Sequence, residues 1–197
     1  MSISAADVKN LREKTGAGMM DCKRALQETN GDMDKAIDYL RKKGIEKVEK
    51  KAGRQTKEGI VQAYIHPGSR LGVLLEVNCE TDFVARNDEF QSFVKDLAMQ
   101  IAAAKPLVVK REDLPQEVVD KEKEIYLGQV KEQGKPDHIA EKIVAGKLEK
   151  YFQEACLMEQ SFVKDPNKTI QELLTEKITT IGENIVIKRF VRYELGE

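Results

Sequence analysis

Few residues of this chain have the types and spacing that enzymatic chemistry requires. The two histidines, His66 and His138, belong to no HExxH motif, so the sequence does not indicate a zinc hydrolase. Cys79 and His66 could form a nucleophile and its base, but they fall at opposite ends of a predicted strand. The rise of an extended strand separates them by on the order of 25 Å, far beyond hydrogen-bond reach. We therefore interpret Cys79 as a small buried apolar residue.

Nucleotide-binding motifs are also absent from the sequence. Gly16-Ala17-Gly18 begins like GxGxxG, but position 21 is Asp and a helical pattern, not a strand, precedes it. No GxxxxGK[ST] string occurs, so a P-loop is not indicated. We expect no metal, no cofactor and no direct nucleotide binding.

The most informative pair of side chains is Asp82 beside Phe83. They lie in the connection between an alternating apolar segment that ends at Cys79 and a helical pattern that has begun by Phe90. One interpretation is structural: Thr81 or Asp82 caps the following turn, and Phe83 packs beneath the preceding hairpin. The other is that a loop on a rigid scaffold presents both side chains to a partner. The pattern alone leaves the two interpretations open.

Met19 and Met20, directly after a glycine-rich loop, are a second candidate contact. Helical phase places one methionine inward and the other outward, and exposed methionine is common at adaptable binding surfaces. The alternative is that both are buried in a small helical bundle.

Composition excludes several classes of protein. Of the 197 residues, 41% are hydrophobic and 34% are charged, which is typical of a soluble globular protein. The net charge of -1 gives no overall attraction to nucleic acid or to a membrane. Three widely spaced cysteines favour a reducing compartment, and no signal peptide or long apolar run is visible. We expect a cytoplasmic protein.

The elements that position these residues follow from periodicity and capping. Residues 1–44 predict a three-helix domain, in which Ser4 with Asp7 and then Asp32 cap helices, and Gly44 ends the third. Residues 45–58 predict a basic linker helix. From residue 41 to 57, eight lysines and arginines stand against two glutamates, a net charge of +6. A solvated helix is one interpretation of this segment, and contact with an acidic partner or RNA is the other.

Residues 59–197 predict a core and dimerisation domain, in which a small antiparallel sheet packs on helices. A hairpin is expected over 59–79, because Leu71–Cys79 alternates with one fully apolar face. A last strand is expected over 184–194, at a sheet edge that can pair with another chain. Helices are expected at about 87–104, 115–131, 136–160 and 169–181. The short break after residue 131 favours antiparallel packing of the middle two helices, and 165–167 is expected to be a loop.

Three stretches of the sequence resemble the signatures of one family. They read LREKTGAGMMDCK at 11–23, NCETDFVA at 78–85 and IGENI at 181–185. With a resemblance that runs essentially from end to end, the chain is identified as a member of the bacterial translation elongation factor Ts family. The family is not enzymatic: its members are guanine-nucleotide exchange factors that release GDP from the GTPase elongation factor Tu. The resemblance implies an α+β fold with a small, UBA-like, three-helix N-terminal domain.

The same resemblance implies which residues contact the partner. Thr81, Asp82, Phe83 and Val84 match the stretch that intrudes near the magnesium and phosphate site, with Phe83 as the wedge. The small helical domain contacts a helix of the GTPase's nucleotide-binding domain, and the matching positions are Arg12, Met19, Met20 and Lys23. Further contact positions in the core are His66, Ile181 and Gly182.

The chain resembles the short form of the family. Longer members carry two related core subdomains, a coiled-coil insertion and a C-terminal module, whereas this sequence predicts one core. In the short form two chains associate to rebuild the double core, which agrees with the expected apolar edge strand. The expected partners are therefore elongation factor Tu and a second copy of this chain, with no membrane and no direct nucleic acid.

Two other functions compete with exchange. An RNA- or ribosome-binding protein would use the basic residues 41–57, but the net charge is nearly neutral and no RNP- or KH-like string occurs. A ubiquitin-type binding adaptor would leave the stretch 81–84 and the closing strand without an assigned use.

Overall fold

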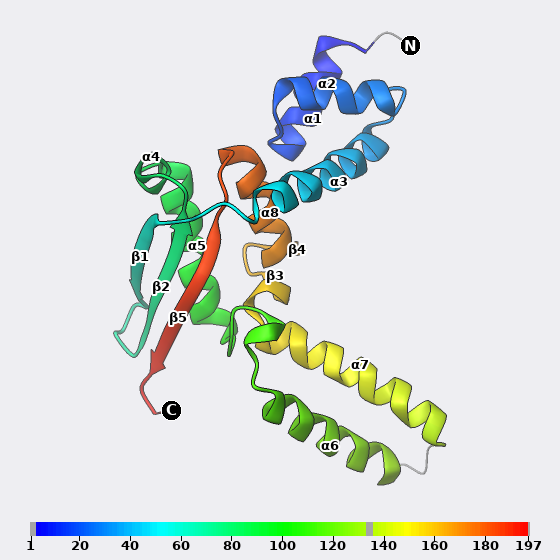
Figure 1. Ribbon diagram of the computed structural model, residues 1–197, viewed down its shortest axis with the longest axis vertical. Helices are drawn as coiled ribbons and strands as arrows, with labels where there is room; N and C mark the ends of the chain where they lie inside the picture. The colour runs from blue at the N-terminus through cyan, green and yellow to red at the C-terminus, as the bar shows by residue number, and fades with distance from the viewer. Residues whose placement is uncertain (1–2, 133–135, 197) are drawn as a thin grey trace. The chain divides into compact units, whose positions relative to one another are not determined.

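The computed structural model describes residues 3–132 and 136–196 (Figure 1). The chain forms two compact units, and each is built from segments that are distant in sequence. The first unit comprises Met1–Ile60, Asn78–Phe93 and Glu172–Val186, and the second comprises Val61–Val77, Val94–Gln171 and Ile187–Glu197. The division expected from the sequence, into domains 1–44, 45–58 and 59–197, concerns which parts fold independently, and it stays a prediction.

The first unit begins with the expected three-helix domain: α1 (Ala5–Thr15), α2 (Met19–Glu28) and α3 (Met33–Lys51) (Figure 1). Ser4 and Asp7 form a reciprocal capping box at the start of α1, and the Asp32 side chain accepts a bond from the Lys35 N–H at the start of α3. Both capping predictions are thus confirmed. The domain's core is apolar and includes the fully buried Leu11, Cys22 and Leu26.

The expected end of the third helix at Gly44 is wrong. Helix α3 continues through Gly44 to Lys51, so the third helix and the linker helix are one element. Gly44 is buried against α8 (Ile170–Ile181), where a Cβ atom would lie 3.4 Å from Thr179 Oγ1 and 3.7 Å from Thr175 Cγ2. Gly44 therefore lies inside a helix, at a contact with α8 that has room only for a small side chain, and does not end the helix.

A three-stranded antiparallel sheet runs in the order β1 (Glu58–Ile65), β2 (Leu71–Cys79) and β5 (Val186–Glu194) (Figure 1). The alternation of β2 is confirmed, since Val73, Leu75, Val77 and Cys79 are all buried. The last strand lies at an edge of the sheet, as expected. Together with the helical domain, this sheet confirms the α+β class.

The other helices follow the predicted pattern except at some ends. Asn87 Oδ1 accepts bonds from the Glu89 and Phe90 N–H groups at 2.7 and 3.4 Å, which confirms it as a capping residue. Helices α6 and α7 form an antiparallel pair, as expected (Figure 1). The helix expected to reach residue 160 ends at Ala155. The bounds are α5 (Asp88–Ala104), α6 (Gln116–Glu132) and α7 (Asp137–Ala155), with short 3-10 turns η1 (Arg111–Asp113) and η2 (Leu157–Glu159).

A short hairpin replaces the loop expected at 165–167. It pairs β3 (Ser161–Phe162) with β4 (Asp165–Thr169) in antiparallel register. The sequence of β4 is polar and has no apolar alternation, so its periodicity gave no sign of a strand. The hairpin leads directly into α8, which begins at Ile170.

Candidate partner-binding site

The turn after β2 forms a four-residue helix, α4 (Asp82–Ala85). Thr81 has extended backbone dihedrals and its Oγ1 accepts a bond from the Val84 N–H at 3.4 Å, so it is the N-cap of this helix. Phe83 does not pack beneath the hairpin, since 82% of its surface is exposed. The capping interpretation of Thr81 is therefore confirmed, and the proposed burial of Phe83 is wrong.

Asp82 directly precedes Phe83 in the chain and is half-buried. One of its oxygens lies 2.9 Å from Arg86 Nη2, one helical turn further on. An exposed pair of this kind contributes little to stability, because water screens it. The turn therefore carries a half-buried carboxylate and an exposed aromatic ring on successive residues.

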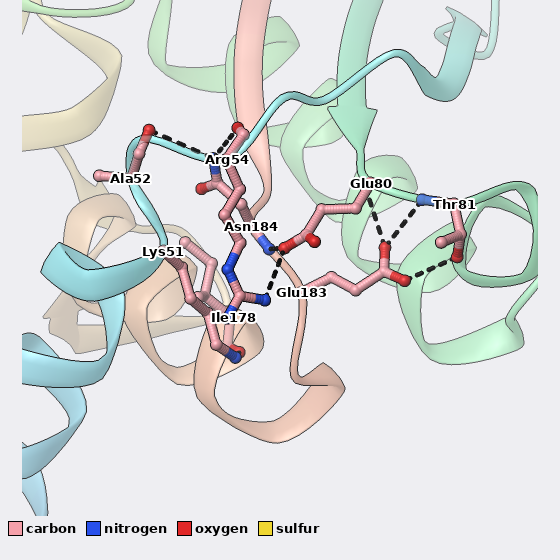
Figure 2. Close-up of polar contacts among 8 residues, drawn as sticks. All are labelled: Lys51, Ala52, Arg54, Glu80, Thr81, Ile178, Glu183 and Asn184. Atoms are coloured by element: carbon pink, nitrogen blue, oxygen red, sulfur yellow. Dashed lines mark hydrogen bonds and ion pairs between the residues drawn. The ribbon is translucent and has the colours of Figure 1, made fainter.

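A carboxylate from a second turn, that of Glu183, holds this first turn in place. Glu183 Oε2 accepts bonds from the Glu80 and Thr81 N–H groups, both at 3.0 Å, and Glu183 Oε1 accepts the Thr81 hydroxyl at 2.6 Å (Figure 2). In the opposite direction, Glu80 Oε1 accepts the Asn184 N–H at 2.6 Å. Glu80 also pairs with Arg54 Nη1 at 3.4 Å. Hydrogen bonds to ionised groups are the stronger kind, so the two turns are firmly joined.

The segment that follows α3 belongs to the same network. The Asn184 side-chain amide donates to the carbonyl oxygens of Arg54 and Ala52, at 3.0 and 3.5 Å (Figure 2). Lys51 Nζ donates to the carbonyl oxygen of Ile178 at 3.3 Å. Sequence reasoning missed this network. The one signal for it was that Glu80, Glu183 and Asn184 all lie in stretches that carry the family resemblance.

The N-terminal candidates are all exposed: Arg12, Met19, Met20 and Lys23. The expectation that one methionine points inward is wrong, since Met19 is 45% and Met20 is 67% exposed. The buried stripe of α2 begins only at Cys22, while Met19 is the first residue of the helix. Both methionines are therefore free to contact a partner.

The remaining candidates lie at turns. Gly182 follows α8 with a φ of 90°, a left-handed conformation that favours glycine, and its N–H donates to the Ile178 carbonyl at 3.1 Å. Ile181, the last residue of α8, is half-buried. Ile181 and Gly182 directly precede Glu183 in the chain, at the start of the second of the joined turns. His66 lies in the second unit, exposed at the β1–β2 turn, with Nδ1 3.0 Å from Tyr64 Oη.

Electrostatics disfavour nucleophilic chemistry at this site. Burial, and secondarily the Glu183 carboxylate, raise the pKa of the Cys79 thiol to about 11, so the thiol is neutral at physiological pH. Within residues 3–132 and 136–196, no three acidic, histidine or cysteine side chains gather as a metal site would need. Over the same residues, no helix has the length and apolarity to cross a membrane. What the site offers is contact chemistry: an exposed ring, a carboxylate and exposed methionines.

The fold and the site define a class: an α+β protein with a three-helix N-terminal domain and a rigidly held turn that exposes an aromatic ring. A sequence model described as Elongation factor TS matches residues 5–197, and the chain belongs to the elongation factor Ts family. It is 64% identical to elongation factor Ts of Carboxydothermus hydrogenoformans, over 99% of this chain and 90% of that protein. It is 60% identical to the Geobacter sulfurreducens protein (100% and 91%) and 61% identical to that of Moorella thermoacetica (99% and 96%), both also named Elongation factor Ts.

Proposed function

We propose that this chain is a guanine-nucleotide exchange factor for elongation factor Tu. It binds the GDP form of that GTPase, disturbs the magnesium and phosphate site, and promotes exchange of GDP for GTP during translation elongation. The observation that carries the proposal is Phe83, an aromatic ring left 82% exposed on a turn that is otherwise fixed by hydrogen bonds. Such a ring gains free energy only when a partner covers it.

The thermodynamics of exchange are those of coupling between two ligands. A factor that speeds release must bind the open GTPase better than the GDP form, and GDP must weaken the factor by the same amount. Burying a Phe side chain contributes roughly 1.5–3 kcal/mol. Since about 1.4 kcal/mol corresponds to a factor of ten, this ring supplies one to two decades of coupling if it is buried only in the open state.

The neighbouring side chains act without breaking a covalent bond, so the protein is not an enzyme of a chemical reaction. Asp82 acts by charge and hydrogen bonding near the ligands of the partner's magnesium ion. Mg²⁺ gives up its water ligands reluctantly, and its binding depends on the groups that hold its ligands in place. Thr81 and Val84 shape the turn. In the N-terminal domain, Met20 and Lys23 provide docking contacts, with Arg12 and Met19 beside them.

The basic segment from 41 to 57 offers little support for RNA binding as the main function. Several of its charges have acidic partners within the chain: Arg41 pairs with Glu172, and Lys47 lies 2.7 Å from Asp21. Lys43 lies 2.9 Å from Glu46. Charges that are already paired release fewer counterions on binding a polyanion.

A second copy of this chain is the other proposed partner. The outer face of the three-stranded sheet is apolar and exposed, with Val61 and Ile65 on β1, Leu74 on β2, and Val191 and Tyr193 on β5. The charged pair on this face, Glu76 and Arg189 at 2.7 Å, is internally neutralised. Contiguous exposed apolar patches mark interaction sites. In a two-fold dimer the same surface meets itself, and a face that is apolar and has no net charge can do so without repulsion between like charges.

The test of the exchange proposal is release of fluorescent GDP from purified elongation factor Tu. The wild-type chain should accelerate release, and Phe83→Ala should lose about tenfold or more of that acceleration while its thermal unfolding is unchanged. Leu107→Ala, which also truncates an exposed apolar side chain, is the matched control and should behave as wild type. Undiminished acceleration by Phe83→Ala would remove the ring from the mechanism.

A further inference from the structure

The helix that carries Phe83 cannot fix its own conformation. It is four residues long, and none of its residues is buried. An isolated helical turn is unstable in water, because nucleation orders several residues for one hydrogen bond. The backbone of the turn that carries Phe83 is therefore held by contacts made outside Asp82–Ala85.

Cys79 Sγ donates to the Thr81 carbonyl at 3.2 Å and Gln91 Nε2 to the Ala85 carbonyl at 3.4 Å, but the charge-assisted contacts among these come from Glu183. Its two oxygens accept three bonds from one short stretch: the N–H groups of Glu80 and Thr81, and the Thr81 hydroxyl. Because the Thr81 proton is directed to Glu183, the lone pairs of Thr81 Oγ1 remain available to accept the Val84 N–H. Glu183 thus orients the hydroxyl that caps the helix.

The backbone around Glu183 is itself fixed from both sides. Gly182, in the left-handed conformation, ends α8 and directs the chain toward the turn. On the other side the Asn184 N–H donates to Glu80 Oε1 at 2.6 Å (Figure 2). Each turn therefore offers a glutamate to the backbone of the other, and we call the four residues Glu80, Thr81, Glu183 and Asn184 the carboxylate clasp.

We infer that Glu183 is a positioning residue for nucleotide exchange, acting through the clasp to hold Asp82 and Phe83 in the orientation that enters the partner. This inference rests on the proposed exchange function. Glu183 orders the turn before the partner arrives, so that little binding free energy is lost in ordering it. The docking contacts of the N-terminal domain do not depend on the clasp.

The test uses Glu183→Gln in the full chain, with Glu49→Gln as the matched control. Glutamine keeps the shape but loses the charge, and its NH2 group replaces one of the two acceptor oxygens, so the three bonds cannot all be kept and those that remain are no longer charge-assisted. Glu49 is exposed on α3 and outside the clasp, so its variant removes one negative charge without touching the turn.

Two readouts are measured on each variant. The first is amide hydrogen exchange by NMR in the chain alone: Glu80 and Thr81 should exchange about tenfold faster or more in Glu183→Gln, with α2 and α5 unchanged. The second is GDP release from elongation factor Tu as a function of exchange-factor concentration. The maximal rate should fall about tenfold, while the half-saturating concentration stays within about twofold, because docking is intact.

Each other outcome counts against a definite part of the inference. Unchanged amide exchange at Glu80 and Thr81 would show that Glu183 does not hold the turn. Faster amide exchange with an unchanged maximal rate would overturn its role in nucleotide release. A raised half-saturating concentration with an unchanged maximum would mean only a smaller folded fraction, and would overturn positioning. If the wild-type chain fails to accelerate GDP release, the proposed function is wrong, and so is the role of Glu183 in nucleotide release. Amide hydrogen exchange at Glu80 and Thr81 still decides whether Glu183 holds the turn.

Discussion

At the scale of single residues, exposure separates side chains that stabilise the fold from those available for function. Phe90 is fully buried at the start of α5, whereas Phe83, seven positions earlier, leaves 82% of its surface in water. Apolar area that stays in water contributes nothing to folding. The fold therefore gains nothing from the ring of Phe83 or from the exposed part of Met20, and we expect both side chains to serve a contact outside the chain.

The three cysteines show the opposite behaviour, since all are buried and free. Burial raises the pKa of all three thiols and is the main cause in each case. The pKa of Cys79 and of Cys156 rises to about 11. We expect none of them to react with a thiol reagent at pH 8 in the native protein, and all three to react promptly in denaturant. Mass spectrometry after timed alkylation measures this.

The pH dependence of the Cys79 and Cys156 thiols has a definite sign. A thiol that ionises near 8.5 in the unfolded chain and near 11 in the folded one stabilises the fold fully below about 8.5. That contribution is lost as the pH rises from about 8.5 to about 11. The alkylation rate of Cys79 should keep rising through this range, and a plateau near pH 9 would contradict the raised pKa.

At the scale of elements, local patterns predicted local structure. The caps at Ser4, Asp32 and Asn87 and the alternation of β2 depend on residues within one or two turns of each other, so they are readable from the sequence. The hairpin at β4 was not readable, because DPNKT has no apolar period. Gly44 was misjudged because a glycine either ends a helix or admits a neighbour, and the neighbour is more than a hundred residues away.

The role of Gly44 gives a prediction at this scale. A Cβ there would meet Thr179 Oγ1 at an ordinary 3.4 Å, so Gly44→Ala should be tolerated and should gain part of the roughly 0.5–1 kcal/mol by which Ala exceeds Gly in helices. Gly44→Leu should instead lower the free energy of unfolding by about 1–3 kcal/mol, since a larger side chain overpacks the contact. Urea unfolding measures both.

A second glycine in a helix serves as the control. Gly146 lies within α7, and a Cβ there would meet nothing within 4 Å. Both Gly146→Ala and Gly146→Leu should therefore leave the protein as stable or more so. If Gly44→Leu proves as harmless as Gly146→Leu, the close approach of α3 and α8 is not a constraint.

At the scale of the whole molecule, the sequence could predict which stretches form the candidate site but not what holds them. The stretches 78–85 and 181–185 were identified from resemblance, residue by residue. The bond from Glu183 to the Glu80 N–H joins residues 103 positions apart, and no periodicity or capping rule reports such a contact. The orientation of Phe83 therefore had to come from the structure.

The sheet face gives the last prediction. If two copies associate through the outer face, Leu74 on the central strand β2 lies in the interface, and Leu74→Lys would bury an unpaired charge there. Sedimentation at micromolar concentration should find a dimer for the wild type and a monomer for Leu74→Lys. Leu107→Lys places the same charge on an exposed leucine outside the sheet and should remain dimeric.

The alternatives in this experiment have distinct structural meanings. A dimeric Leu74→Lys would place the contact at the β5 edge, where backbone pairing between strands tolerates a lysine on the face. A monomeric wild type would leave the sheet face to the GTPase or to another protein. The rest of strand β2 separates Leu74 from the Thr81–Val84 turn. GDP release measured on the monomeric variant then decides whether one chain suffices for exchange. Retained acceleration would mean that a single copy carries every essential contact.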